Sequence, residues 1–175
     1  MSFLRLSPII ATLLVGALLL TPCAHAGDVS MAGGSVNFST PNSWLGIMET
    51  QGDPEVRVFQ VPDPSPTANS ALARVTVTVK QVADIGGFQQ YMAGATQKAK
   101  ALTGYQAGAA PSGPNSAAYT AQENGAPFVY SERYWFKDNH AIQLRCVRPA
   151  QSQAGAQWSH AFDQGCDAIA ASLRS

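Results

Sequence analysis

Apolar and polar residues alternate along several short stretches of the chain, and a two-residue period is typical of half-buried β-strands. The clearest case is Leu72–Lys80, where Val75, Val77 and Val79 share one face and polar side chains share the other. The same reasoning predicts six further strands, at residues 35–39, 44–48, 55–61, 117–121, 128–136 and 141–147. Residues 27–34 are small and polar and are predicted to form a loose lead-in, whereas the proline-dense residues 62–67 are predicted to form a loop.

A period of three to four residues replaces the alternation in two places and predicts two principal helices. The first follows Asp84, a suitable N-cap, and ends before Gly104. The second occupies residues 158–173 near the end of the chain. The predicted inward stripes are Phe88, Met92, Ala95, Ala99 and Leu102 in the first helix, and Trp158, Phe162, Gly165, Cys166, Ile169 and Leu173 in the second.

The stretch from Phe128 to Val147 has the pattern of a tight β-hairpin. Asp138 and Asn139 tolerate the left-handed backbone that short hairpin turns require. A turn centred on these two residues places Tyr134 opposite Gln143, and Glu132 opposite Arg145. Because opposite charges then face each other across the strands, the register is self-consistent.

This order of strands, helix, strands and helix predicts an α+β fold with a mainly antiparallel sheet and two principal helices. The stretch from Phe38 to Trp44, the hairpin and the closing stretch Ile169–Leu173 resemble PsbP-like domains, and the similarity spans nearly all of Ser35 to Leu173. That group includes a photosystem accessory subunit, a Ran-binding nuclear import factor, cell-envelope proteins and chaperones of secreted effectors. The resemblance implies a binding or assembly module with no shared catalytic motif, and the PsbP-like fold by itself does not choose among these roles.

Residues 1–26 have the composition of a secretory signal peptide. An apolar run follows Arg5, and Ala24-His25-Ala26 provides a small-x-small cleavage site before Gly27. We therefore expect residues 27–175 to form one exported domain, located in the periplasm and not inserted in a membrane. The alternative is an outer-membrane lipoprotein anchored through Cys23, although the proline directly before that cysteine suits a lipidation signal poorly.

Cleavage after Ala26 removes Cys23 and leaves two of the three cysteines, Cys146 and Cys166. Both lie on predicted inward faces, and an oxidising compartment favours a disulfide between them, with two buried thiols as the alternative. The same cleavage removes Arg5 and leaves ten Lys and Arg against eleven Asp and Glu. This near-neutral balance, without a basic run, argues against nucleic acid as a partner.

Few residues of the exported chain suit catalysis or metal binding. Its two histidines are His140, in the predicted hairpin turn and expected to face solvent, and His160, three residues before Asp163 on the second helix. No nucleophile elbow, Cys-x-x-Cys or His-Glu-x-x-His motif occurs, so we expect no enzyme activity, no metal and no cofactor, and both histidines to be dispensable. The remaining enzyme hypothesis is a hydrolase that uses His160 as a base.

One face of the predicted hairpin combines tyrosine and arginine with hydrogen-bonding groups, a composition typical of protein interfaces. Its residues are Tyr130, Glu132, Tyr134, Gln143 and Arg145. These observations favour a periplasmic protein that binds a protein or envelope component in an accessory, assembly or toxin-neutralising immunity role. The alternative for this face is that the first helix half covers it. The alternative for the function is a carrier that holds a small apolar ligand between helix and sheet.

Overall fold

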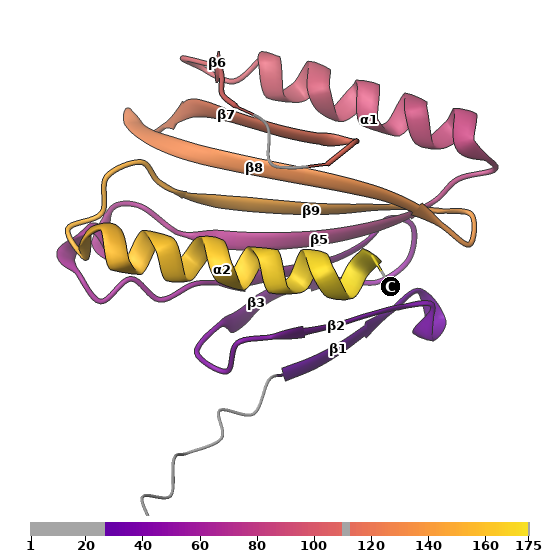
Figure 1. The fold of residues 1–175 in the computed structure, drawn as a ribbon, viewed down its shortest axis with the longest axis horizontal. Helices are drawn as coiled ribbons and strands as arrows, with labels where there is room; N and C mark the ends of the chain where they lie inside the picture. The colour runs from indigo at the N-terminus through magenta and orange to yellow at the C-terminus, as the bar shows by residue number, and fades with distance from the viewer. Residues whose placement is uncertain (1–26, 110–112, 175) are drawn as a thin grey trace, which may run out of the picture.

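The computed structural model describes residues 27–109 and 113–174. The predicted signal peptide and Cys23 lie outside this part of the chain. An antiparallel sheet of seven strands forms its centre, in the order β3-β4-β5-β9-β8-β7-β6 (Figure 1). The seven strands are β3 (Leu45–Thr50), β4 (Glu55–Gln60), β5 (Arg74–Gln81), β6 (Gln106–Ala107), β7 (Ser116–Glu123), β8 (Ala126–Lys137) and β9 (His140–Pro149).

Helices cover both faces of this sheet. A separate two-stranded hairpin lies on one of these two faces, in the same core as the C-terminal helix. The elements are β1 (Gly27–Met31), β2 (Val36–Thr40), α1 (Ile85–Lys100) and α2 (Gly155–Arg174), with short 3-10 turns at Ala32–Gly34 and Pro66–Asn69. This arrangement confirms the predicted α+β class with two principal helices and a mainly antiparallel sheet. Among the described residues, no helix combines the length and the apolar character that a bilayer span requires.

The hairpin β8–β9 has the register that its sequence predicts. Tyr134 pairs with Gln143, and Glu132 pairs with Arg145. Asp138 and Asn139 form the turn with positive φ values of 48° and 56°. Two consecutive left-handed residues match the right-handed twist of the flanking strands, so the turn chemistry determines which side chains share a face.

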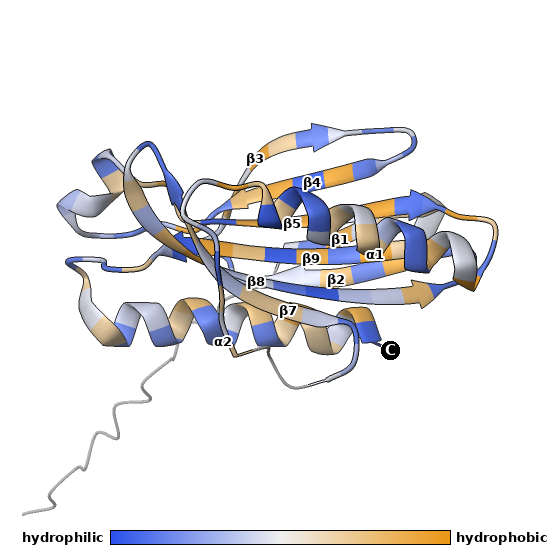
Figure 2. Cartoon of the chain, turned by 90° about the horizontal axis from the view of Figure 1, so that it is seen from above, coloured by the Kyte–Doolittle hydropathy of each residue, from blue (hydrophilic) through white to orange (hydrophobic). Residues whose placement is uncertain are grey.

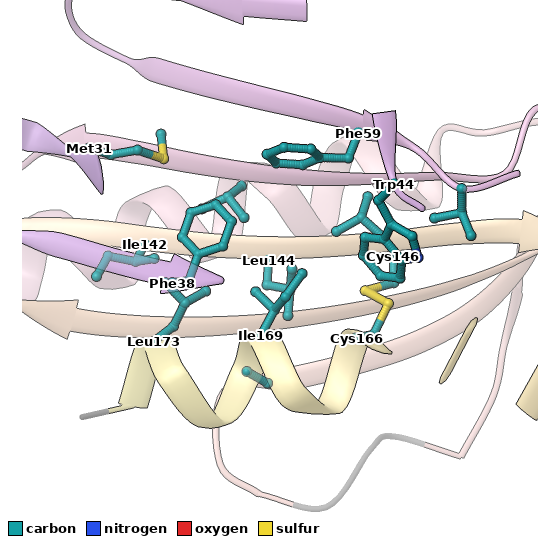
Figure 3. Packing of buried hydrophobic residues seen from close by; sticks show 14 of the residues in the cluster. Met31, Phe38, Trp44, Phe59, Ile142, Leu144, Cys146, Cys166, Ile169 and Leu173 are labelled. Atoms are coloured by element: carbon teal, nitrogen blue, oxygen red, sulfur yellow. A yellow bond between two sulfur atoms is a disulfide. The ribbon is translucent and has the colours of Figure 1, made fainter. Parts of the chain in front are cut away.

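The main core lies between one face of the sheet and α2 (Figure 3). Val75, Val77 and Val79 of β5 are buried on this face, as the alternation in their sequence predicts. The α2 stripe meets them through Phe162, Ile169 and Leu173, among others. Covering a Val-rich strand with an apolar helical stripe removes apolar surface from water, which favours folding.

The prediction that residues 27–34 form a loose lead-in is wrong. Gly27–Met31 form β1, which pairs with β2 from Gly27 opposite Thr40 to Met31 opposite Val36. Met31 and Phe38 are buried in the core beside α2. Only Val29 and Met31 alternate in this stretch, so the apolar signal is too short to identify a strand whose stability comes from its packing.

α1 packs on the opposite face of the sheet. The side chain of Asp84 accepts a hydrogen bond from the backbone N–H of Gly87 at 2.9 Å, which confirms the predicted N-cap. Phe88 packs against Tyr134 and Ala141 of β8 and β9, with Tyr91, Met92 and Ala95 beside them. α1 therefore covers the face of the hairpin that carries Glu132 and Arg145.

Gly165 of α2 is a position of close approach. A Cβ atom placed on it would lie 2.5 Å from Cζ2 of Trp44, whose ring also stacks on Phe162 at 6.1 Å. We expect Gly165→Ala to lower the free energy of unfolding by about 1–3 kcal/mol, because the indole must move within a packed core. Urea denaturation measures this change. Gly94→Ala on α1 is the control, since its Cβ meets nothing within 4 Å, and equal effects of the two substitutions would contradict the prediction.

Candidate functional site

The five residues predicted to bind a partner lie beneath α1. Tyr130, Glu132 and Tyr134 expose only 0%, 3% and 6% of their surface. Gln143 and Arg145 are half-buried. Of the two arrangements that the sequence allows, the structure has the one in which the first helix covers this face. Partner contact by these five residues stays a prediction, and in this arrangement only Gln143 and Arg145 reach the surface.

Glu132 is the centre of a buried polar network. One carboxylate oxygen, Oε1, accepts a hydrogen bond from the hydroxyl of Tyr119 at 2.7 Å and lies 3.0 Å from Nε of Arg145 in an ion pair. The other oxygen, Oε2, accepts from the hydroxyl of Tyr134. Arg145 also donates through Nη2 to the Tyr119 hydroxyl at 3.1 Å. A buried carboxylate with several partners is far less costly than an unpaired one.

The network continues to α1 through Gln143. Its amide nitrogen donates to the hydroxyl of Tyr134 at 3.2 Å, and its amide oxygen accepts from the hydroxyl of Tyr91 at 2.7 Å. Because Tyr91 belongs to α1 whereas Gln143 and Tyr134 belong to the sheet, these bonds fix the helix against the strands. The polar network therefore has a structural role in joining two layers.

Electrostatics keep the tyrosines of this network neutral. Burial and the nearby charge of Glu132 raise the pKa of Tyr91 to about 12, and the same two causes raise the pKa values of Tyr119 and Tyr134. Burial alone would lower the pKa of Arg145, but Tyr119 and Glu132 outweigh it and raise that pKa. At neutral pH the tyrosines are hydrogen-bond donors, and none of them is poised to act as a base or nucleophile.

A second network flanks the first. The ring of Tyr130 stacks on Tyr119 with centroids 4.6 Å apart, and the guanidinium of Arg145 lies over the Tyr130 ring at 5.2 Å. The Tyr130 hydroxyl donates to Glu123, which also receives two hydrogen bonds from Arg74. Burial alone would raise the pKa of Glu123, but the hydrogen bonds from Arg74 and Tyr130 outweigh it and lower that pKa. Arg145 therefore contacts both networks, through Glu132 and Tyr119 in the first and through the ring of Tyr130 in the second.

A groove opens beside this network, between α1 and the sheet. Its volume is about 480 Å³. We call it the α1 groove and define it by Tyr91, Gly94 and Lys98 of α1 and Lys80, Gln143 and Arg145 of the sheet. It lies where the apolar-ligand hypothesis places a ligand, between helix and sheet, but charged and amide side chains form much of its wall.

The two histidines lie apart from this network. His140 pairs with Lys137 at the end of the β8–β9 hairpin and is half-buried, less open than its turn position predicts. His160 is exposed on α2. Asp163, its predicted partner, instead accepts two hydrogen bonds of 3.0 Å from Arg148. A carboxylate already bound by arginine is poorly placed to orient a histidine base.

The disulfide between Cys146 and Cys166 is present, as predicted (Figure 3). It joins β9, in the middle of the sheet, to the inward stripe of α2. The bond is consistent with an extracytoplasmic location, because cytosolic thiols are normally kept reduced.

Among the large apolar side chains of the described sheet strands, those with the highest exposed fractions are on β3. Leu45, Ile47 and Met48 expose 53%, 46% and 51% of their surface. In the described part of the chain β3 pairs only with β4, so one side of its backbone is unpaired (Figure 2). The register shifts between Gly46 and Met48, a bulge that Ile47 occupies. The sequence predicts a strand at residues 44–48, but no local pattern distinguishes an edge strand from a central one.

No family model matches the chain, and no curated protein matches it in sequence. The Ran-binding protein Mog1p of Saccharomyces cerevisiae matches it in structure with a TM-score of 0.55 at 13% identity, over 85% of this chain and 94% of Mog1p. A point mutant of Mog1 matches with a TM-score of 0.50 at 11% identity, over 86% and 93% of the two chains.

LpqN of Mycobacterium tuberculosis, described as involved in cell envelope biogenesis, has a TM-score of 0.48 at 13% identity, over 83% of this chain and 87% of LpqN. At identities this low, structural likeness shows the fold and not the activity. The likeness to the two Mog1 structures shows that the chain has the Mog1/PsbP-like fold that its sequence resemblance implies.

Proposed function

We propose that the protein is an exported binding protein that takes an extended segment of a partner protein along β3. The observation that carries this proposal is the exposed apolar edge of Leu45, Ile47 and Met48. An unpaired strand edge offers backbone donors and acceptors, and alternate side chains supply specificity when a peptide adds to the sheet. Export to the periplasm rests on the Ala24-His25-Ala26 site together with the disulfide.

A groove continues from this edge toward β1. It has a volume of about 480 Å³, and its wall includes Asp28, Ile47, Glu49 and Arg57. Arg57 is paired with Glu49 at 3.0 Å and with Glu55 at 2.8 Å, so acidic groups outnumber the basic one. We infer that the bound segment is apolar with basic residues. Mog1p, which shares the fold, is described as a Ran-binding protein, so the fold can support a protein-binding role.

We expect the bulge at Ile47 and the charge of Glu49 to disfavour indiscriminate pairing at this edge. Charges and bulges on edge strands disfavour sheet-to-sheet aggregation. A partner segment must accommodate the displaced Ile47 and the charge of Glu49, and this requirement makes the edge selective. An accessory, assembly or toxin-neutralising role would each use such a surface, and the identity of the partner would choose among them.

We expect Ile47→Glu to reduce recovery of the partner and to weaken its binding at least tenfold, because the apolar side chain that would anchor the segment is replaced by a charged one, whose burial against an apolar partner surface is costly. Tagged protein incubated with envelope extract, followed by quantitative mass spectrometry and a binding titration, measures this effect. Ile85→Glu is the matched control, because Ile85 is equally apolar and exposes 54% of its surface at the start of α1.

Both substitutions should leave the free energy of unfolding within about 0.5 kcal/mol of the wild type. Undiminished capture by the Ile47→Glu variant would overturn the proposal. So would sedimentation showing that β3 is covered by a second copy of this chain, because the occupant would then be the protein itself.

A further inference from the structure

The α1 groove has an excess of positive charge. Lys80, Lys98 and Arg145 line it, against the single carboxylate of Glu132. That carboxylate is already bound by two tyrosine hydroxyls and by Arg145. Lys80 lies 3.5 Å from Asp53, but both side chains are well exposed and such a pair is weak. Within the described residues Lys98 makes no ion pair or hydrogen bond.

Arg145 adds a directional donor to this charge. Its side chain is 35% exposed, and the described residues offer no hydrogen-bond partner to its Nη1 atom. The contacts of its guanidinium with Glu132, Tyr119 and the Tyr130 ring hold it in place before any ligand arrives. A guanidinium fixed in this way suits a carboxylate, phosphate or sulfonate group, whose oxygens match its planar fork.

The groove also has room for an apolar body. Tyr91, Gly94 and Ala95 of α1 line it, and the last two bring only small groups to the wall. A Cβ atom added at Gly94 would meet nothing within 4 Å. The volume of about 480 Å³ lies in the range of sites for small organic ligands.

We propose that the α1 groove binds a small organic anion, with its acidic group at Lys98 and Arg145 and its apolar body along Tyr91 and Gly94. This site is separate from the β3 edge and does not depend on the proposed function. It also changes the ligand hypothesis drawn from the sequence, because the wall selects for negative charge in addition to apolar surface.

Two fluorescent probes with the same aromatic body test the proposal. We expect 8-anilinonaphthalene-1-sulfonate to bind the purified protein saturably, and its neutral analogue N-phenyl-1-naphthylamine to bind at least about tenfold more weakly. Lys98→Glu should weaken binding of the sulfonate probe about tenfold, since it reverses one nearby charge. Gly94→Leu should abolish binding by filling the groove.

Lys100→Glu is the matched control. It reverses a charge in the same last turn of α1 without lining the groove, so probe affinity should be unchanged. Ile47→Glu should also leave it unchanged, which separates this site from β3. Circular dichroism and thermal melting verify the fold of each variant. Absence of sulfonate-probe binding, equal affinity for the neutral probe, or affinity unaffected by both Lys98→Glu and Gly94→Leu would overturn the proposal.

Discussion

Replacing Glu132 with alanine is expected to lower the free energy of unfolding by about 3 kcal/mol or more. The substitution removes the acceptor of two buried tyrosine hydroxyls and the ionic partner of Arg145. A buried donor left without an acceptor costs about 1–3 kcal/mol, and two are created at once. Because Arg145 is partly exposed, water can replace some of the interactions that its guanidinium loses. Urea denaturation measures the change.

Asp167→Ala is the matched control for this prediction. Asp167 is also a carboxylate paired with an arginine, Arg133, but its side chain is 62% exposed. Its loss should cost no more than about 1 kcal/mol, as exposed pairs do. Similar effects of Glu132→Ala and Asp167→Ala would show that the buried network does not stabilise the fold.

A double-mutant cycle tests the coupling within the network. Tyr134→Phe should cost about 1 kcal/mol in the wild type, where its hydroxyl donates to Glu132. In the Glu132→Ala background the same substitution should cost less, because the hydroxyl has already lost its acceptor and only the hydrogen bond that it accepts from Gln143 remains to be lost. Additive effects would mean that the two side chains stabilise the fold independently.

Loss of the disulfide is expected to lower the free energy of unfolding by about 3 kcal/mol. The bond closes a loop with a sequence separation of 20 residues and joins the central strand β9 to α2. In the double variant with Cys146→Ala and Cys166→Ala, the unfolded chain regains the freedom that the cross-link removes. Chemical denaturation of this variant beside the wild type measures the difference.

Denaturation of the wild-type protein in reductant separates the effect of the covalent bond on stability from the effect of the packing of the sulfur atoms. Both cysteines are buried in the core, so the alanine variant also leaves a small cavity that the reduced wild type does not have. A non-reducing peptide map should recover Cys146 and Cys166 as one linked pair. Two reactive thiols at these positions, with stability unchanged by reductant, would contradict the prediction.

The elements predicted correctly from sequence are those whose patterns are local and long. The β8–β9 register follows from Asp138-Asn139, and the α2 stripe from Phe162 to Leu173 is regular enough to orient the helix. The sequence does not predict β1, because two alternating residues are too weak a signal. The stability of this strand comes from its pairing with β2 and from packing. A local sequence pattern predicts an element well only when tertiary packing does not decide between two possible structures of the same segment.

The candidate site shows a different limit. Tyrosine, glutamate and arginine on one strand face suit an open interface and a buried hydrogen-bond network equally well. What decides between them is the position of α1, whose Phe88 packs on Tyr134. That contact joins segments far apart in the chain, so composition of the hairpin alone cannot reveal it. The exposure of β3 likewise depends on which strands pair with it.

The place of β9 in the sheet sets the order in which the structure can be completed. In the described part of the chain β9 is the last strand, yet it lies between β5 and β8 and is the only strand that links the two halves of the sheet. Until residues 140–149 have been synthesised, one edge of the Val-rich strand β5 has no partner. An open apolar edge invites aggregation. A nascent chain of this protein therefore cannot complete its sheet until its C-terminal part has been synthesised, a property that fits the proposed export before folding.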